Sequence, residues 1–188
     1  MKKKSRILLV DDEPNIRVLL TAILQSKGYI VDCAEDGFAA LHSIQTNLPD
    51  LIVSDLRMPN MNGFELLAVV RNKFPEMPII AISGEFVGER IEGGLADAFF
   101  QKAHYSPSDL LAAVENLLEG RRPVFSGEQE IPVWAPTGDA PVMLTCNECL
   151  RSFPIDPCGE HRNNQNEIQC IFCGVLLRFR LLAVTKPA

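Results

Sequence analysis

The sequence predicts an α/β protein in which a doubly wound, five-stranded parallel sheet is followed by a small β-rich module. Over the first 120 residues, short apolar runs alternate with amphipathic stretches, as in a parallel sheet with helices on both faces. Five of the six cysteines lie within residues 146–173, which sets that segment apart. The length of 188 residues suits one full domain and a small module.

The alternation predicts five strands and five helices in the first domain. Strands are expected over residues 7–10, 29–34, 51–54, 79–83 and 98–101. Helices are expected between Pro14 and Gly28 and near residues 38–46, 64–74, 87–94 and 107–118. The last helix has the clearest beginning, because Ser106 is suited to cap it and Asp109 stands three residues further on.

Composition divides the chain into a domain over 1–120, a Pro- and Gly-rich linker over 121–141 and a module over 142–188. The linker is not wholly polar, since Ile131, Val133 and Trp134 favour packing of part of it on a domain.

The net charge of −6 lies entirely in the first domain, where 11 Lys and Arg residues face 17 Asp and Glu residues; residues 121–188 carry 7 of each kind. This balance disfavours nucleic-acid binding, which usually needs a basic surface. The apolar run at residues 7–10 is too short for a signal peptide or a membrane span, so we expect a cytoplasmic protein without membrane contact.

Polar residues follow several predicted strands, at the sheet edge where ligands bind in doubly wound folds. They are Asp11, Asp12, Asp55, Ser83 and Lys102. Clustered carboxylates repel one another, and a hard cation such as Mg²⁺ relieves that repulsion. A lysine and a hydroxyl beside them can bind the oxygens of a phosphoryl group. The expected reaction is attack by a carboxylate on phosphorus, giving an aspartyl phosphate.

These residues, in this order, resemble the receiver domains of two-component response regulators over roughly residues 5–119. The resemblance implies a flavodoxin-like fold and phosphorylation of Asp55 by a sensor histidine kinase or a phosphotransfer protein. It also implies that Mg²⁺ is bound by Asp12, Asp55 and the backbone carbonyl of Arg57, with Asp11 acting mainly through water. Ser83 and Lys102 would contact the phosphoryl oxygens, and Phe99 would be an aromatic switch residue.

Three positions in the first domain carry further expectations. Receivers usually have proline after the lysine, and Ala103 stands there instead, which predicts a less firmly placed Lys102. The alternative for Phe99 is a core position, which is the more common one for an aromatic residue in a buried strand, and only its spacing to Lys102 favours a switch residue. Cys33, in the second predicted strand, is expected to be a small buried hydrophobic residue.

The cysteines form two CxxC pairs separated by 20 residues, a spacing typical of a structural Zn²⁺ site. The expected ligands are Cys146, Cys149, Cys170 and Cys173. The segment resembles zinc ribbons, with one departure. Gly174 directly follows the second CxxC pair, as is usual, but Leu150 follows the first. A rubredoxin-type iron site, disulfides, and a role for Cys158 with His161 remain alternatives. Four protein ligands would leave the metal no open position for catalysis.

We therefore expect a response regulator whose zinc ribbon contacts an output protein that the sequence does not name, and not an enzyme acting on a separate substrate. One alternative is a transcription regulator whose ribbon binds DNA. Its candidate phosphate contacts are Arg151, Arg162, Arg178 and Arg180. Another alternative is a stand-alone phosphate sink.

Overall fold

A computed structural model describes residues 4–84, 95–102, 104–120, 131–134, 142–155 and 167–182. The predicted helix near residues 87–94, the non-proline position Ala103, and the pair Cys158 and His161 lie outside these residues. No helix in the described part of the chain is both long and apolar enough to cross a bilayer.

The N-terminal domain is a parallel sheet of five strands in the order β2-β1-β3-β4-β5. The strands are β1 (Arg6–Val10), β2 (Ile30–Ala34), β3 (Leu51–Asp55), β4 (Ile79–Ser83) and β5 (Ala98–Gln101). The helices are α1 (Pro14–Ser26), α2 (Gly37–Thr46), α3 (Gly63–Lys73) and α4 (Pro107–Leu118). This strand order confirms the doubly wound, flavodoxin-like fold.

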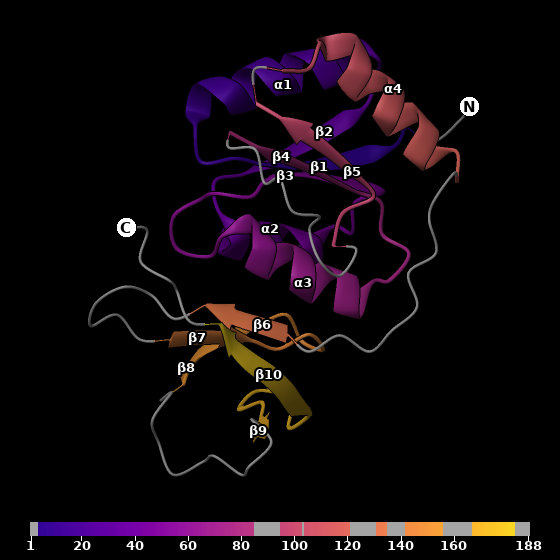
Figure 1. The fold of residues 1–188 in the computed structure, drawn as a ribbon. Coiled ribbons are helices and arrows are strands. Elements are labelled where there is room, and N and C mark those ends of the chain that lie inside the picture. Colours follow the sequence, from indigo (N-terminus) through magenta and orange to yellow (C-terminus); the bar gives the residue numbers. More distant parts are fainter. Residues whose placement is uncertain are drawn as a thin grey trace, which may run out of the picture.

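The sheet is buried on both faces, with α1 and α4 on one side and α2 and α3 on the other (Figure 1). The side chains of β1 point alternately to the two faces of the sheet, so this strand contributes to both apolar cores. Ile7 and Leu9 belong to the cluster beneath α1 and α4, whereas Leu8 and Val10 belong to the cluster beneath α2 and α3. A strand buried on both faces must be apolar throughout, as the run at residues 7–10 is.

Local capping fixes where several helices begin. The Asp36 side chain accepts a hydrogen bond from the backbone N–H of Ala39 at the start of α2. Asn62 with Glu65, and Ser106 with Asp109, form reciprocal capping boxes at α3 and α4. The predicted cap of the last helix is thus confirmed.

Two side chains expected to be buried are exposed. Cys33 lies on β2, an edge strand of the sheet, where its Sγ is 3.2 Å from Thr21 Oγ1. Phe99 on β5 is 38% exposed, so the alternative that it is a core residue is wrong. Both strands are at edges, where helices cover side chains less completely than over β1 and β3.

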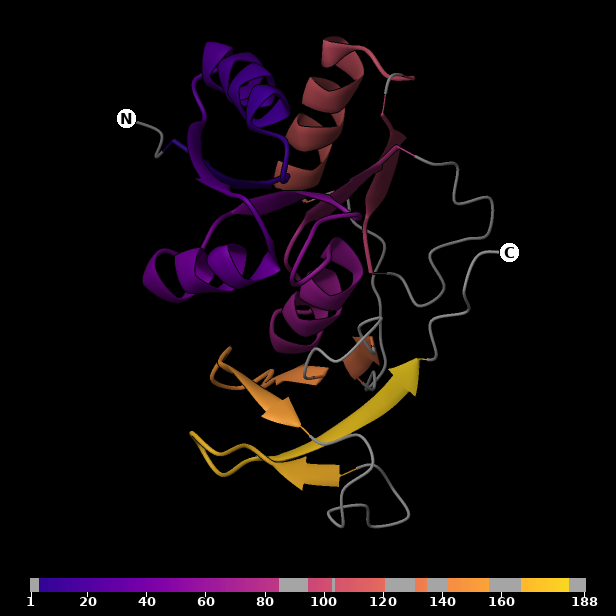
Figure 2. The same ribbon diagram turned by 90° about the vertical axis from the view of Figure 1, so that its left-hand side faces the viewer.

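The cysteine module contains two antiparallel hairpins and a strand from the predicted linker. β7 (Val142–Thr145) pairs with β8 (Ser152–Ile155), and β9 (Glu167–Gln169) pairs with β10 (Leu176–Leu182). β6 (Ile131–Trp134), which the sequence analysis did not predict, pairs in parallel with β10 and also contacts α3. The module therefore lies against the α2 and α3 layer of the N-terminal domain (Figure 2).

A buried ion pair joins α3 to the segment before β5. Arg71 and Asp97 have side-chain exposures of 4% and 1%, and Arg71 Nη2 lies 3.1 Å from Asp97 Oδ2. The same Asp97 oxygen accepts a hydrogen bond from the backbone N–H of Ile79 (2.7 Å). Arg71 also donates to the carbonyls of Pro75 and Met77. The pair thus ties α3, β4 and the approach to β5 together.

Replacing Asp97 with alanine should lower the free energy of unfolding of the full chain by about 3 kcal/mol or more, because it leaves the Arg71 charge buried without its carboxylate. Urea denaturation followed by circular dichroism measures this. Asp32→Ala is the control, since the Asp32 ion pair with Arg6 is about one-third exposed and should contribute less than about 1 kcal/mol. Equal losses in the two variants would contradict the structural role of the buried pair.

Candidate phosphorylation site and cysteine cluster

Three carboxylates meet where the strand order reverses, between β1 and β3. Asp11 and Asp12 follow β1 and Asp55 ends β3, and each offers an oxygen within 4.8 Å of the others. Asp11 and Asp55 are buried, at 2% and 4% exposure. The structure therefore brings these three residues together, as their positions after the strands predicted. Their carboxylate oxygens suit a hard cation, which prefers oxygen ligands.

Lys102 is the positive charge at this cluster. Its Nζ lies 2.6 Å from Asp55 Oδ2, 3.2 Å from Asp11 Oδ2 and 3.1 Å from Glu13 Oε1. Burial alone would lower the pKa of Lys102, but the hydrogen bonds to Asp55 and Glu13 and the nearby carboxylate charges outweigh it and raise the pKa. Lys102 is therefore a permanent cation beside the candidate phosphoacceptor.

Lys102 does not fully offset the cost of keeping the buried Asp11 carboxylate ionised. Burial raises the pKa of Asp11, and the charge of Asp55 adds to the rise, while the Glu13 backbone N–H and Lys102 act in the opposite direction. A divalent cation beside Asp11 would offset the cost of holding this buried carboxylate ionised. The residues present thus fit Mg²⁺.

Two further groups border the acceptor. The backbone N–H of Arg57 donates to Asp55 Oδ1 (3.1 Å), which places the Arg57 peptide beside the carboxylate. Ser83 is fully buried at the end of β4, and its Oγ has no hydrogen-bond partner within the described structure. A buried hydroxyl without a partner is costly, and a phosphoryl oxygen would supply one.

Gly63 allows the loop after β3 to return over the acceptor. Its N–H donates to the carbonyl of Leu56, and a Cβ built on it would lie 2.0 Å from the Asp55 carbonyl oxygen. No side chain fits at that distance, so the start of α3 can approach the Asp55 backbone only through glycine.

The four candidate zinc ligands lie together in the second module. Cys146 Sγ is 3.6 Å from Cys173 Sγ, and Cys149 Sγ is 3.7 Å from Cys170 Sγ. These separations are far longer than a disulfide bond, and the residues are free cysteines. A tetrahedron with metal–sulfur bonds of about 2.3 Å has edges of about 3.8 Å, so the sulfur positions fit a Zn²⁺ ion.

The ionisation of these thiols also fits a cation. Burial raises the pKa of Cys146 to about 12 and also raises that of Cys149. Burial acts in the same direction on Cys170, but the backbone N–H groups of Cys173 and Phe172 outweigh it and lower the pKa to about 7. Without a metal the cluster would hold few thiolates near neutral pH, whereas Zn²⁺ favours the thiolate form of every ligand.

The DNA-binding alternative gains little from the arginines whose side chains the structure describes. Arg178 Nε lies 2.7 Å from Glu167 Oε1, and the Arg151 guanidinium lies 5.4 Å from the centre of the Phe172 ring. Arg162 and the Arg180 side chain are outside the described part of the chain.

Comparison with known proteins decides the family of the N-terminal domain. The family model described as "Response regulator receiver domain" matches residues 7–115, more than half of the chain. The chain belongs to the response regulator receiver family. Asp55 and Lys102 both lie within the matched residues.

Individual relatives support the assignment over the same region. The chain is 36% identical over 124 residues to response regulator Rre1 of Synechocystis, covering 63% of this chain and 53% of that protein. It is 36% identical over 121 residues to response regulator MprA of Mycobacterium sp. (strain KMS), covering 63% and 52%. The chain thus spans about half the length of these curated relatives.

Solved receiver structures have the same fold. A CheY-like receiver domain protein from Methanospirillum hungatei matches with a TM-score of 0.57 and 30% identity, covering 62% of this chain and 95% of that one. The response regulator TrrA of Thermotoga maritima, in complex with Mg(2+)-BeF, matches with a TM-score of 0.56 and 35% identity, covering 60% and 98%. The receiver fold is therefore shown, while these matches leave most of the cysteine module uncovered.

Two features of the receiver site were not predicted from the sequence. Glu13 contacts the Lys102 ammonium, as Asp11 and Asp55 do. The one hint of this contact in the sequence is that Glu13 directly follows the pair Asp11 and Asp12. The close approach of Gly63 to Asp55 was also missed, because a glycine at a helix start has no special signal in the sequence.

Substituting Gly63 with alanine should slow phosphorylation from a small-molecule phosphodonor at least tenfold, because the new methyl group would displace the Asp55 backbone. The rate is measured by Mg²⁺-dependent incorporation of phosphate. Gly84→Ala is the control, since among the described residues its added Cβ would meet the Lys102 side chain alone, at 3.9 Å, an ordinary contact. A Gly63→Ala protein with the parent's rate and melting temperature would contradict this account.

Proposed function

We propose that this protein is a two-component response regulator that a sensor histidine kinase or phosphotransfer protein phosphorylates on Asp55. The observation that carries the proposal is the 2.6 Å contact between Lys102 Nζ and Asp55 Oδ2 within a buried group of three carboxylates. A buried carboxylate next to a fixed cation is a nucleophile in a site that can also hold the negative charge of a phosphoryl group.

The chemistry follows from the same contacts. An Asp55 oxygen attacks the phosphorus of a phosphohistidine, the new O–P bond forms as the P–N bond breaks, and the imidazole leaves with its electron pair. Asp11, Asp12, Asp55 and the Arg57 carbonyl would bind Mg²⁺, which offsets negative charge on the transferring group. Lys102 and the Ser83 hydroxyl would contact the phosphoryl oxygens, and Phe99, exposed on β5, would report the change.

The cysteine module is the second half of the proposal: Cys146, Cys149, Cys170 and Cys173 bind one structural Zn²⁺, and the module contacts an output protein. Support comes from sulfur separations that match a tetrahedral ion. An interaction role is favoured by the exposed apolar side chains of Ile171, Phe172 and Leu176. The output is a signalling contact and not a reaction on a separate substrate, because four thiolates fill the coordination of the metal.

Replacing Asp55 with asparagine should abolish phosphorylation by a small-molecule phosphodonor in the presence of Mg²⁺, since the amide lacks the nucleophilic oxygen charge. Acid- and base-labile phosphate on the intact protein is the measurement. Asp32→Asn, on the partly exposed edge strand β2, is the control and should be labelled at the parent's rate. Labelling of Asp55→Asn as fast as the parent would mean that another residue is the acceptor.

Serine in place of Cys146 or Cys170 should reduce zinc content from about one ion per chain to nearly none, and should unfold the cysteine module without unfolding the receiver. Thiolate ligation stabilises such sites by roughly 10 kcal/mol or more near neutral pH, which a module of this size cannot replace from its own core. Elemental analysis gives the metal content. Cys33→Ser and Cys158→Ser should keep their zinc, and loss of zinc only in Cys158→Ser would refute the four-cysteine assignment.

A further inference from the structure

The turn that follows the first CxxC pair has an unusual residue at its end. The N–H of Leu150 donates to the Cys146 carbonyl (2.8 Å), just as the N–H of Gly174 donates to the Cys170 carbonyl (2.9 Å), so the two turns are equivalent. Both residues have a left-handed backbone, with φ of 56° at Leu150 and 76° at Gly174. Glycine adopts this conformation freely and leucine does so at a cost, so the leucine side chain must compensate by what it contacts.

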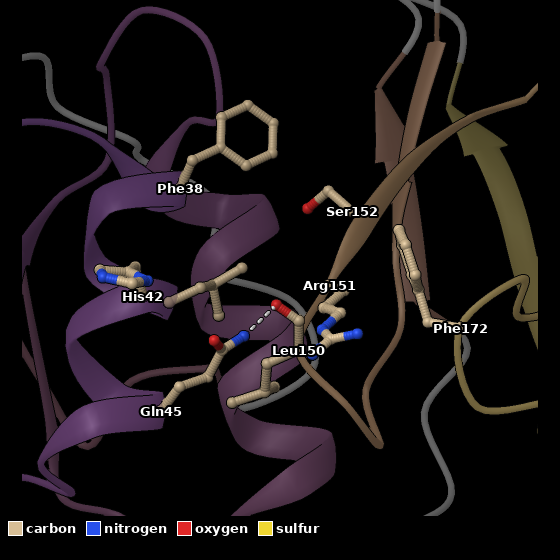
Figure 3. Close-up of a pocket in the computed structure, with 8 residues that line it drawn as sticks. Phe38, His42, Gln45, Leu150, Arg151, Ser152 and Phe172 are labelled. Carbon is tan, nitrogen blue, oxygen red and sulfur yellow. Dashed lines mark hydrogen bonds between the residues drawn. The ribbon is translucent and has the colours of Figure 1, made fainter.

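The Leu150 side chain lies in the core of the receiver. It is 6% exposed and belongs to one apolar cluster with Leu41 and Ile44 of α2, which it meets from the side of the cysteine module (Figure 3). It is the one member of that cluster from the cysteine module among the described residues. A Cβ on Gly174, in contrast, would meet no described residue within 4 Å. The first turn is therefore built to contact the receiver, and the second is not.

Polar contacts hold the same turn against the receiver. The Gln45 side chain, on α2, donates from Nε2 to the carbonyls of Leu150 (2.9 Å) and Cys149 (3.3 Å). Figure 3 shows Gln45 reaching from α2 to Leu150. Lys73, at the end of α3, forms an ion pair with Glu148. The receiver thus grips residues 148–150, and one of these residues is a candidate zinc ligand.

The contact between the cysteine module and the receiver leaves part of the facing surface open. A groove of about 270 Å³ remains open beside Leu150, bordered by Phe38, His42, Ser152 and Phe172 (Figure 3). A contact between domains that leaves a groove open beside its apolar anchor suits reversible docking better than permanent association. Its stability then depends on whether the turn that presents the anchor is preformed.

We propose that Leu150 anchors the first zinc turn to the α2–α3 face of the receiver, and that zinc occupancy controls whether the module stays docked there. This proposal rests on the proposed zinc site. Zinc fixes the turn from Cys146 to Cys149, and the docked state needs that turn in the same conformation. Two events that require one conformation stabilise each other, so zinc binding and docking are thermodynamically linked. Zinc is thus a second input to the regulator, beside phosphorylation.

Hydrogen exchange of α2, measured by mass spectrometry on the full chain with and without a zinc chelator, tests the link. In the parent, chelation should speed exchange of α2 amides at least threefold. Leu150→Gly relaxes the backbone of the turn while it removes the anchor. It should keep about one zinc per chain, yet its α2 should exchange as fast as in the chelated parent and should not respond to the chelator.

Pro154→Ala, a change at an exposed apolar residue of the same module on β8, is the control and should behave as the parent does. Gln45→Ala should give an intermediate exchange rate. Unchanged α2 exchange in zinc-loaded Leu150→Gly, or in the parent after its zinc has been removed, would overturn the docking proposal alone. A parent that contains no zinc would instead overturn the proposed metal site, and zinc control with it.

Discussion

Parallel pairing of β1 with β2 on one side and β3 on the other is the constraint on which the rest of the structure depends. The chain reverses its direction of strand addition at this point, so the loops after β1 and β3 diverge to opposite faces of the sheet and leave a crevice between them. Asp11 and Asp55 lie in that crevice because Asp11 directly follows β1 and Asp55 ends β3. The acidic cluster is thus a consequence of strand order.

That position has an electrostatic cost, which the surrounding elements partly offset. Lys102 reaches the cluster from the residue that follows β5, two strands away from β3, and contacts Asp11, Glu13 and Asp55 together. The backbone N–H groups of Glu13 and Arg57 donate to the Asp11 and Asp55 carboxylates. Burial still raises the pKa of Asp11, so a further cation at this site would lower the cost of holding the Asp11 carboxylate ionised.

The sequence predicted those features that depend on local pattern and chain order. Continuous apolar runs identified the buried strands, and since parallel strands end at one edge, residues such as Asp55 and Lys102 could be placed together without coordinates. The exposure of Cys33 and Phe99 was harder to predict, because hydrophobicity does not reveal how fully helices cover an edge strand. β6 could not be found within the linker, since its partner β10 lies more than 40 residues further along the chain.

The contact between the modules illustrates a different limit. The sequence showed that leucine stands at position 150, where a zinc ribbon usually has glycine. This residue is unfavourable only if the cysteine module is considered alone. The reason for the leucine lies on α2, about 105 residues earlier, where Gln45 and Leu41 supply the complementary surface. A residue that is unfavourable in its own turn and favourable at a distant interface cannot be explained from local preference.

Helix α2 connects the two halves of the molecule physically. At its beginning, the Gly37 N–H donates to the Met61 carbonyl in the loop that follows Asp55, and a Cβ on Gly37 would lie 2.6 Å from Met61 Cγ. At its other end Gln45 holds the first zinc turn. A movement of the loop after the phosphoacceptor would press directly on α2, and a rigid helix of ten residues would carry that displacement to the turn. The same helix is therefore in contact with the sites of both proposed inputs, phosphate and zinc.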